Sequence, residues 1–355
     1  MKTVLITGGA GFIGSHAAEE FSKDGWQVVV LDNLSRSRLF NSKGKTVEYN
    51  WKFLSTCKNV NLILGDVRNP KDVANAFPRK KIDLVIHAAS QPGVRRSIAD
   101  PAEDFEINAG GTVNVLESLR RTNPGGAFIY LSTNKVYGEN VSSIPLIEKK
   151  TRYKFRGIQG IKESVTIDQT GHSPYGASKY VGDLYTQEYG ITYGLRTAVF
   201  RMSCVYGTRQ FGFEDQGWVT WFTLAALAGK PVRIYGNGKQ VRDVLYVKDL
   251  ISAIQRFYGS KVHHGVWNIG GGPQNTLSLL ELVNHLEKLT GRKMKLRYHN
   301  WRPMDQRVYI TDLKKMKKQF QWEPVWTVEH GVTFLFNWIQ ENKKLFQTLS
   351  SNGRF

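Results

Sequence analysis

The feature that most constrains the fold is a glycine-rich turn directly after a short apolar run at the N-terminus. Val4-Leu5-Ile6 has the pattern of a buried strand, the segment from Gly8 to Gly14 reads Gly-Gly-Ala-Gly-Phe-Ile-Gly, and an amphipathic stretch runs on to Phe21. In this order of strand, turn and helix, Gly8 allows the tight turn, Gly11 lets the backbone approach a pyrophosphate, and Gly14 lets the helix pack on the strand. The turn therefore predicts a dinucleotide-binding unit at the start of the chain.

Short apolar runs alternate with helical segments through the first half of the chain. The runs after the first lie at 28–31, 61–66, 82–89 and 128–131, and small or polar residues end or follow them. Strands that alternate with helices are typical of a parallel sheet covered by helices on both faces. We therefore predict an α/β fold, a doubly wound parallel sheet of the Rossmann type, with a smaller, interleaved C-terminal lobe for the substrate.

The chain is long enough for two lobes, with 355 residues of which 41% are hydrophobic. We predict that residues 1–203, with 242–275 returning, form the dinucleotide-binding domain. Residues 204–241 and 276–342 are expected to form the substrate-binding lobe, and residues 343–355 have the composition of a frayed tail.

The second predicted strand ends at Asp32, whose carboxylate is placed to accept hydrogen bonds from an adenosine ribose. Because an acid here repels a 2′-phosphate, it favours NAD over NADP, although Arg36 and Arg38 follow closely and could reach a phosphate. Farther along, Asp66 is a candidate acceptor for the adenine amino group, and the small pair Ala88-Ala89 lets the backbone pass beside the cofactor.

Two polar residues in apolar surroundings need an explanation. His87 ends a predicted strand without an acid nearby in sequence, so a packed or capping histidine is favoured over a catalyst. Asn108 lies on the apolar side of a helical pattern over 101–121, where a buried amide needs a partner. It hydrogen-bonds either the nicotinamide ribose or a neighbouring strand, and the sequence leaves both alternatives open.

The formal net charge of +19, from 49 Lys and Arg against 30 Asp and Glu, suits nucleic acid, an anionic surface or anionic substrates. The basic residues are dispersed, and the densest runs, at 79–81, 314–318 and 343–344, have the length of solvated helix faces. Aromatic residues do not interleave with them, so we expect no nucleic-acid partner. Cys57 and Cys204 lack metal-ligand and disulfide spacing, so no metal is expected. Without a signal-peptide pattern or a membrane-length apolar run, we expect a cytoplasmic protein with no membrane partner.

The candidate catalytic residues are a hydroxyl pair and a Tyr-x-x-x-Lys pair. Ser132 and Thr133 follow an apolar run, while Tyr175 and Lys179 open a helical pattern one turn apart. Tyrosine acts as a base only when its pKa lies well below about 10, and the Lys179 ammonium, together with a positive nicotinamide ring, would lower it. Thr133 is placed to hydrogen-bond the reacting hydroxyl. Spacing alone is weak evidence, because the segment Tyr235–Lys239 has it too, without the glycine turn and the threonine.

These residues resemble those of the nucleotide-sugar epimerase and dehydratase family of extended short-chain dehydrogenases. The matching segments, which cover nearly the whole chain, are 8–14, 65–68, 132–138, Tyr175 with Lys179, 236–243 and 302–306. By this resemblance Thr133, Tyr175 and Lys179 carry catalysis. The residues expected to hold NAD are Gly8, Gly11, Phe12, Ile13, Gly14, Asp32, Asn33, Asp66, Val67, Ala88, Ala89, Asn108, Ser132, Tyr175 and Lys179.

Asn134 and Lys135 separate the branches of this family. The sugar 4,6-dehydratases carry an Asp-Glu pair there, and decarboxylating relatives carry an acid in place of Lys135, so the resemblance implies an epimerase. The segments 132–138, 151–153, 172–176, 207–211 and 215–219 are similar to those of enzymes that invert C2 of CDP-linked sugars. Cys204 also replaces an Asn that most 4-epimerases carry.

The resemblance implies transient oxidation at C2 of a CDP-linked hexose, a 3,6-dideoxy sugar or a fully hydroxylated one, with NAD kept bound through turnover. Arg242 and Arg302 are expected on the diphosphate. The expected substrate contacts are Thr133, Asn134, Ser203, Gln216, Trp218, Val219, Arg242, Arg302 and Asp305.

Two rival functions and one structural question accompany this prediction. A UDP-sugar 4-epimerase, acting on UDP-glucose or UDP-glucuronate, would use the same catalytic residues with another sugar pose. An NAD-responsive RNA-binding relative would suit the charge, yet it would be free to lose Tyr175 or Lys179. The insertion 148–171 is either a lid whose Arg152 and Arg156 meet phosphate, or a solvated surface excursion.

The resemblance also implies a homo-oligomer, a dimer or a tetramer, because the helices expected at 103–121 and 175–190 form the interfaces in this family.

Overall fold

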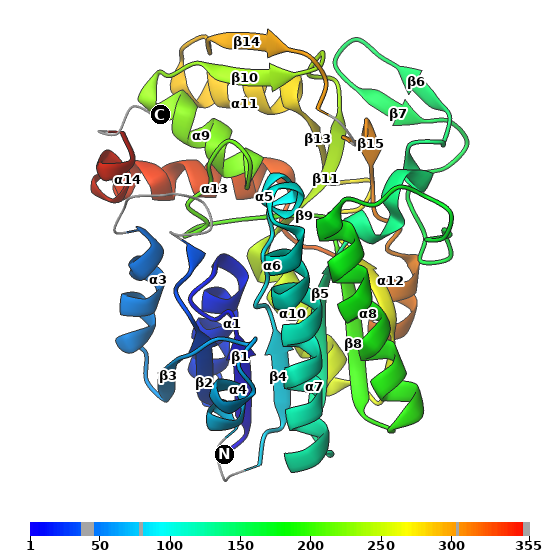
Figure 1. Cartoon of the computed structure of the whole chain (residues 1–355). Coiled ribbons are helices and arrows are strands. Elements are labelled where there is room, and N and C mark those ends of the chain that lie inside the picture. The colour runs from blue at the N-terminus through cyan, green and yellow to red at the C-terminus, as the bar shows by residue number, and fades with distance from the viewer. Residues whose placement is uncertain (37–45, 78–80, 303–304, 351–355) are drawn as a thin grey trace. The chain divides into compact units, whose positions relative to one another are not determined.

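The computed structural model describes residues 1–36, 46–77, 81–302 and 305–350, which fall into two compact units (Figure 1). The first comprises Met1–Val136, His172–Arg201 and Ile251–Trp267, and the second Tyr137–Gly171, Met202–Leu250 and Asn268–Phe355. The sequence assigned residues 137–171, 202–203, 242–250 and 268–275 to the first domain, whereas they lie in the second unit. The predicted boundaries of the two domains remain a prediction.

The first unit contains most of the regular structure. Its strands are β1 Thr3–Thr7, β2 Gln27–Asp32, β3 Val60–Leu64, β4 Leu84–His87, β5 Ala127–Thr133, β8 Arg196–Met202 and β12 His264–Ile269. Its helices are α1 Phe12–Lys23, α3 Thr46–Ser55, α4 Pro70–Ala76, α5 Val94–Ala99, α6 Pro101–Phe105, the π-helical turn η1 Glu106–Gly110, α7 Gly111–Thr122, α8 Pro174–Thr192 and α10 Val247–Gly259.

The strands of this unit form a seven-stranded sheet in the order β12-β8-β5-β4-β1-β2-β3. The central pairs are parallel, with Val4 opposite both Val28 and Leu84, and Val85 opposite Phe128. β1 and β5 are buried at every residue, as expected for strands that helices cover on both faces. The predicted α/β fold with a doubly wound parallel sheet is confirmed.

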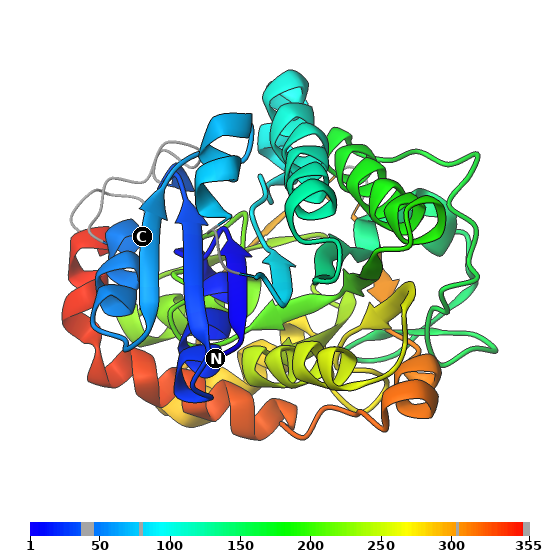
Figure 2. The same cartoon turned by 90° about the horizontal axis from the view of Figure 1, so that it is seen from below.

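Helices cover both faces of this sheet (Figure 2). α4, α7 and α8 pack side by side on one face, and α1 and α10 lie on the other. The core between the sheet and its helices includes Leu5, Val85, Leu116, Phe128 and Val199. Because β1, β2, β4 and β5 pair in parallel, their carboxyl ends lie along one edge of the sheet, and the predicted site residues follow there.

The second unit is made of shorter elements. Its strands are β6 Leu146–Glu148, β7 Tyr153–Phe155, β9 Cys204–Tyr206, β10 Val232–Tyr235, β11 Val241–Tyr246, β13 Thr276–Ser278, β14 Leu296–His299 and β15 Val308–Tyr309. Its helices are the 3-10 segment η2 Asn134–Val141, which begins in the first unit and ends in the second, α9 Trp218–Ala228, α11 Leu279–Thr290, α12 Lys314–Phe320, α13 Val328–Glu341 and α14 Lys343–Ser350.

In the described part of the second unit, three strands pair with β11. β9 and β15 pair with it in parallel, β13 pairs antiparallel, and β10 pairs with β14 separately. α9 is buried at every position from Val219 to Ala226 and contacts both α11 and α13. A helix that is apolar all round belongs in an interior, so α9 forms the centre of this unit.

The C-terminal segment differs from the predicted tail. Residues 343–350 form α14, and the buried ring of Phe346 packs on Phe211 and Trp338, with ring centroids 5.6 and 5.9 Å apart. An aromatic side chain with two aromatic partners is enough to hold a short helix in place. Residues 351–355 lie outside the described part of the chain.

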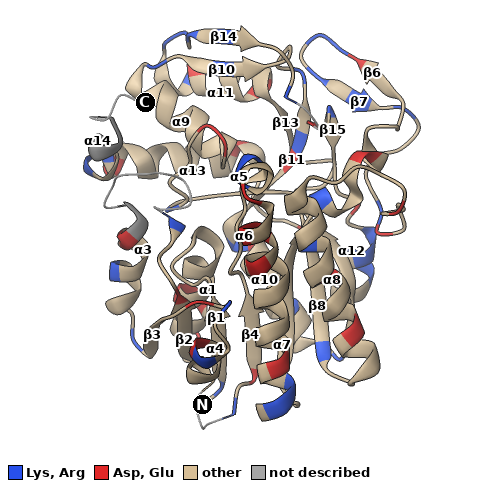
Figure 3. Cartoon of the chain, in the orientation of Figure 1, with Lys and Arg blue, Asp and Glu red and all other residues tan. Residues whose placement is uncertain are grey.

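Charge is distributed over elements throughout the chain (Figure 3). The basic run 314–318 forms α12, where Met316 and Phe320 are buried and Lys317 and Lys318 are exposed. This run is a solvated helix face, as predicted.

Across residues 1–36, 46–77, 81–302 and 305–350, no helix combines the length and the apolar character needed to span a membrane. The same residues contain no cluster of His, Cys, Asp and Glu side chains suited to a metal ion.

Candidate active site and cofactor pocket

The glycine turn leaves room for an anion at the start of α1. Gly8 has φ +68°, and a Cβ there would lie 2.5 Å from the backbone N of Ala89, while a Cβ at Gly14 would clash with the carbonyl O of Gly8. At Gly11, among the described residues, a Cβ would meet only that same carbonyl O, at 3.0 Å. Gly11 is also the N-cap residue of α1 and has no side chain to cap the helix. The N–H groups of the first turn, which holds Phe12 and Ile13, therefore fit the pyrophosphate of NAD.

Asp32 lies beside this turn at the end of β2. Its Oδ2 accepts a hydrogen bond from the N–H of Ala10 at 2.9 Å, and its Oδ1 accepts one from the N–H of Leu34 at 2.8 Å. Burial raises the pKa of Asp32, and these donors counteract the rise. Burial lowers the pKa of the nearby Arg36 to about 10, which the charge of Asp32 opposes. An acid in this place suits the ribose hydroxyls of NAD, and Arg38 lies outside the described residues.

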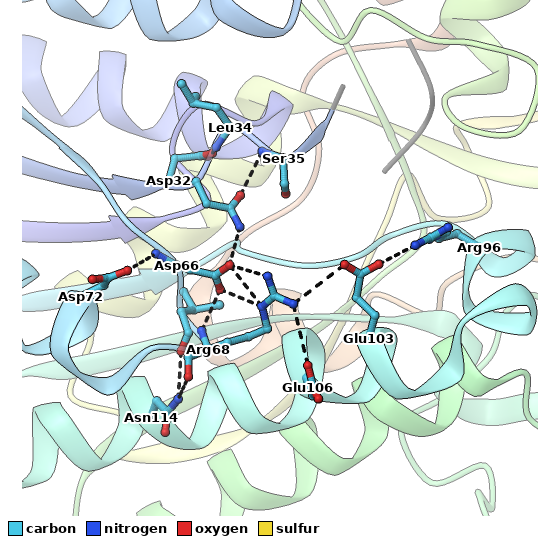
Figure 4. Close-up of polar contacts among 12 residues, drawn as sticks. Asp32, Leu34, Ser35, Asp66, Arg68, Asp72, Arg96, Glu103, Glu106 and Asn114 are labelled. Atoms are coloured by element: carbon cyan, nitrogen blue, oxygen red, sulfur yellow. Dashed lines mark hydrogen bonds and ion pairs between the residues drawn. The ribbon is translucent and has the colours of Figure 1, made fainter. Parts of the chain in front are cut away.

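Asp66 lines a pocket of about 340 Å³ together with Arg68, Asn69, Asp72 and Glu106. Its carboxylate accepts hydrogen bonds from Asn33 and Arg68 (Figure 4). Partial burial raises the pKa of Asp66, but the hydrogen bonds from Arg68 and Asn33 outweigh this and lower it to about 2. The neighbouring Val67 is tied to α7, because its carbonyl accepts a hydrogen bond from Asn114 at 3.0 Å. These residues line an open depression on the surface of the first unit.

The predicted catalytic residues Thr133 and Tyr175 are brought together by the sheet edge and the first turn of α8. Thr133 is the last residue of β5, and the side chain of Ser173 caps α8 just before Pro174 and Tyr175. The backbone N–H of Tyr175 also donates to the Oγ of Ser97 at 3.0 Å. The side chain of Thr133 lies near enough to that of Tyr175 to lower the pKa of its hydroxyl.

Two opposing effects act on the pKa of Tyr175. Burial raises it to about 12, with a further rise from the charge of Asp104, while the hydrogen bond from Thr133 lowers it. In the structure the lowering contribution comes from Thr133. The further lowering by a charged Lys179 and the nicotinamide ring stays a prediction.

Lys179 is buried below Tyr175 on the same helix. Its ammonium lies 4.1 Å from the centre of the Tyr130 ring. Burial lowers the pKa of Lys179 to about 7, and the charges of Asp183 and Asp104 oppose this shift. The charge on Lys179 is therefore sensitive to its surroundings near neutral pH.

Asn108 lies in η1, which interrupts the helix predicted over 101–121. Its Nδ2 donates to the carbonyl O of Gln91, to Asp104 and to Ser178 at 3.0–3.1 Å, and its Oδ1 accepts from the N–H of Gln91 at 2.9 Å. These hydrogen bonds favour the alternative in which Asn108 joins neighbouring segments. Its role as a cofactor contact stays a prediction.

Ser132 is also engaged within the protein. It is 1% exposed, and its Oγ donates to Asp183 at 2.9 Å. Asp183 lies one turn after Lys179 on α8 and forms a buried ion pair with Arg201. Asp183 and Asp104 were not among the residues predicted for the site. Their signal in the sequence is helical spacing, since Asp183 lies four residues after Lys179 and Asp104 four residues before Asn108.

His87 is a packed histidine, as predicted. Its Nδ1 is 2.7 Å from the hydroxyl of Thr7 and its Nε2 is 3.1 Å from that of Thr112, and its ring stacks on Phe128 and Tyr130. Burial lowers the pKa of His87 to about 3, so the ring is neutral at pH 7.

The other predicted substrate contacts divide between the units. Thr133 and Asn134 belong to the first unit, and the remaining contacts belong to the second. Gln216 forms an antiparallel bridge with Phe213, Trp218 begins α9, and Val219 is 1% exposed. Ser203 donates to the carbonyl and to the carboxylate of Asp243.

The two arginines predicted to hold a diphosphate each pair with an aspartate. Arg242 lies 2.6 Å from Asp305, and Arg302 lies 2.9 Å from Asp215. The guanidinium of Arg302 also stacks on the ring of Tyr235, 3.9 Å from its centre. The carboxylates hold both guanidinium groups in defined positions.

The insertion 148–171 is fastened to the second unit. Arg152 forms an ion pair with Glu281, Nε to Oε1 2.6 Å, and donates to Thr276 at 2.9 Å. Tyr153 and Ile161 add backbone hydrogen bonds to Lys239 and Ile310. Arg152 is therefore engaged by protein groups, whereas Arg156 is exposed.

The second Tyr-x-x-x-Lys pair is not a catalytic pair. Tyr235 ends β10 and donates to Glu214 at 3.0 Å, whereas Lys239 pairs with Glu148 at 2.6 Å. The two side chains have separate partners, because a turn and not a helix joins them.

Comparison with known proteins agrees with this architecture. The family model described as the NAD dependent epimerase/dehydratase family matches residues 4–270. The chain is 41% identical to a CDP-paratose 2-epimerase of Salmonella typhi, over 94% of this chain and 98% of that protein. It is 31% identical to a putative UDP-glucose 4-epimerase of Methanocaldococcus jannaschii, over 96% of this chain and 99% of that one.

Among solved structures, the chain is similar to a UDP-glucuronic acid 4-epimerase from Bacillus cereus in complex with UDP-glucuronic acid and NAD. The TM-score is 0.79 at 26% identity, and the match covers 96% of this chain and 99% of that one.

Proposed function

Because the chain belongs to the NAD dependent epimerase/dehydratase family, we propose that it inverts C2 of a CDP-activated hexose. CDP-paratose and CDP-tyvelose are the first candidate pair, and CDP-glucose and CDP-mannose the second. The 41% identity to a CDP-paratose 2-epimerase supports the choice of C2 and of CDP, since the relative named as a UDP-glucose 4-epimerase is 31% identical.

The observation that carries the proposal is the placement of Thr133 at the end of β5 and of Tyr175 in the first turn of α8, in the unit that contains the glycine turn. A hydroxyl pair at the carboxyl edge of the sheet can receive a sugar hydroxyl between them. In this role Tyr175 takes the proton of the C2 hydroxyl and later returns it, and Thr133 holds that hydroxyl by a hydrogen bond.

NAD held at the glycine turn would supply the redox chemistry, as the acceptor of the C2 hydride and as its donor to the other face of the sugar. No net oxidation results, so the protein has no need to release the cofactor between turnovers. The protein must retain the 2-keto sugar while the sugar ring rotates and presents its other face to the cofactor.

Lys179 supplies positive charge beneath Tyr175 when it is protonated. Because burial lowers the pKa of Lys179 to about 7, a proton can leave it near neutral pH, and Asp183 and Asp104 favour its retention. A charged Lys179 stabilises the phenolate of Tyr175, which burial disfavours.

Arg242 and Arg302 are proposed to bind the diphosphate of the sugar nucleotide. Arginine suits phosphate because its planar fork donates in pairs. The net charge of +19 assists, since the substrate and the cofactor both carry diphosphates and a positive protein attracts them.

A labelling experiment tests the proposal. Purified protein is incubated in deuterated buffer with CDP-, UDP- and GDP-hexoses, and C2 and C4 inversion are followed by proton NMR. We expect C2 inversion of a CDP-hexose without deuterium at C2, because the hydrogen returns from the cofactor. Deuterium at C2 would show exchange of the C2 proton with solvent instead, and C4 inversion of a UDP-hexose would replace the proposal with a UDP-sugar 4-epimerase.

A homo-oligomer, a dimer or a tetramer, is part of the proposal. Large apolar side chains are exposed on α5, α6 and α8: Ile98, Phe105, Leu184, Tyr185 and Ile191. Exposed apolar groups on neighbouring helices are typical of subunit interfaces. Light scattering after gel filtration tests this, and a monomeric mass at micromolar concentration would contradict it.

A further inference from the structure

The carboxylate of Asp66 is fully used by hydrogen bonds within the protein (Figure 4). Oδ1 accepts from the backbone N–H of Arg68 at 2.9 Å and from its Nε at 3.1 Å. Oδ2 accepts from the Nη2 of Arg68 at 2.7 Å and from the Nδ2 of Asn33 at 2.9 Å. An ionised carboxylate offers about four lone-pair positions, so a base that donates to Asp66 must replace one of these donors.

Arg68 is itself held from its other side. Its Nη1 lies 3.8 Å from both Glu103 and Glu106, and Glu103 is tied to Arg96 at 2.7 Å. The carbonyl of Arg68 accepts a hydrogen bond from Asn114 at 3.2 Å. The guanidinium therefore lies between Asp66 on one side and acidic groups of α6 and η1 on the other.

The donors on Asp66 differ in how firmly they are bound. Arg68 makes a charge-assisted fork, and such hydrogen bonds are roughly twice as strong as neutral ones. Asn33 makes one hydrogen bond from a neutral amide, and its own Oδ1 is occupied by the N–H of Ser35 at 3.0 Å. An incoming neutral amino group replaces the Asn33 amide at a lower cost than the arginine fork.

We propose that Arg68 is a positioning residue that makes the cofactor pocket selective for adenine. The fork from Arg68 fixes the plane of the Asp66 carboxylate, and the amino group of adenine takes the position of the Asn33 amide. Hypoxanthine carries a carbonyl oxygen where adenine carries this amino group, and that oxygen faces an ionised carboxylate that cannot donate to it. The proposal rests on NAD binding and on Asp66 facing the base, and it is independent of the sugar.

A competition experiment on the full-length protein tests this. Each variant is equilibrated with equal concentrations of NAD and nicotinamide hypoxanthine dinucleotide, and the bound dinucleotides are extracted and quantified by chromatography. We expect the ratio of bound NAD to the hypoxanthine analogue to fall about ten-fold or more in Arg68→Met. This is the change in binding that the loss of one hydrogen bond to a charged group produces. Arg121→Met is the matched control, since the exposed Arg121 pairs with Glu117 at 2.9 Å, and it should keep the wild-type ratio.

Further variants separate positioning from folding. Arg68→Lys keeps the charge without the fork, and we expect its ratio of bound NAD to the hypoxanthine analogue to lie between those of the wild type and Arg68→Met. If Arg68→Met retains no dinucleotide, the ratio in Arg68→Lys should still lie below that of the wild type. Asp66→Ala should lose the selectivity, and Asn33→Ala should keep or increase it. An unchanged or higher ratio in Arg68→Met, a wild-type ratio in Arg68→Lys or Asp66→Ala, or a loss of selectivity in Asn33→Ala each overturns the proposal. Failure of the labelling experiment on sugars leaves these ratios unaffected.

Discussion

Arg201 and Asp183 form a buried ion pair in the first unit, with Nε 2.8 Å from Oδ2 and Nη2 3.1 Å from Oδ1. Ser132 donates to the same carboxylate at 2.9 Å, and the negative charge of Asp183 opposes the loss of the proton from Lys179. The pair therefore joins β8 and the end of β5 to the helix that carries Tyr175 and Lys179.

Asp183→Asn should destabilise the protein strongly, because it removes the carboxylate that balances the buried charge of Arg201. We expect the free energy of unfolding in urea to fall by about 3–5 kcal/mol. Glu48→Gln is the control, since Glu48 pairs with Lys52 on an exposed helix surface and should cost less than about 1 kcal/mol. Equal losses in the two variants would show that the Arg201–Asp183 pair has no special weight.

Tyr175→Phe should retain NAD and lose turnover. The substitution keeps the ring and removes the hydroxyl that is proposed to take the proton of the substrate, so we expect a rate about 10²- to 10⁴-fold lower on the CDP-hexose. Bound NAD is measured by chromatography after denaturation. Tyr193→Phe, at the exposed end of α8, should leave both readouts unchanged. A wild-type rate in Tyr175→Phe would remove Tyr175 from the proton transfer.

His87 should make the stability of the protein fall as the pH falls. Its pKa is about 3 in the folded protein, against the ordinary histidine value of 6.5, so between these values the unfolded chain binds a proton that the folded chain does not. The free energy of unfolding then decreases by up to about 1.4 kcal/mol for each unit of pH below 6.5.

His87→Gln, which can still hydrogen-bond Thr7 and Thr112, should lack this contribution. Urea unfolding at about pH 7.5 and about pH 5.5 measures it, and we expect the wild type to lose about 1.4 kcal/mol more than the variant between the two. The same loss in both proteins would mean that His87 takes up a proton between these two pH values in the folded protein, as it does in the unfolded chain.

Arg152→Met should affect stability and leave substrate binding unchanged. Arg152 bonds Glu281 and Thr276, and losing hydrogen bonds to a charged group should cost about 1.5–3 kcal/mol. Arg156→Met is the matched control from the same insertion, and its exposed side chain predicts little effect. A raised KM for the sugar nucleotide at unchanged stability would instead restore Arg152 as a phosphate ligand.

Motifs that depend on neighbours within a few residues were predictable. The glycine turn, the Ser173-Pro174 start of α8 and the buried strands β1 and β5 occur where the sequence indicates. The predicted helix over 101–121 is less regular, since η1 and the weak helix formers Gly110 and Gly111 interrupt it. A π-helical turn has no periodic pattern that distinguishes it from an α-helix.

The sequence by itself determined the fold class, the dinucleotide turn and the residues of the Tyr-x-x-x-Lys pair, because each is encoded by local spacing and by side-chain size. Only the tertiary structure decided which partner each polar side chain meets. Asn108 reaches Ser178, 70 positions away, and Arg152 reaches Glu281, 129 positions away. The packing of a whole unit brings such groups within hydrogen-bond distance, and a buried donor then takes the acceptor that the packing supplies.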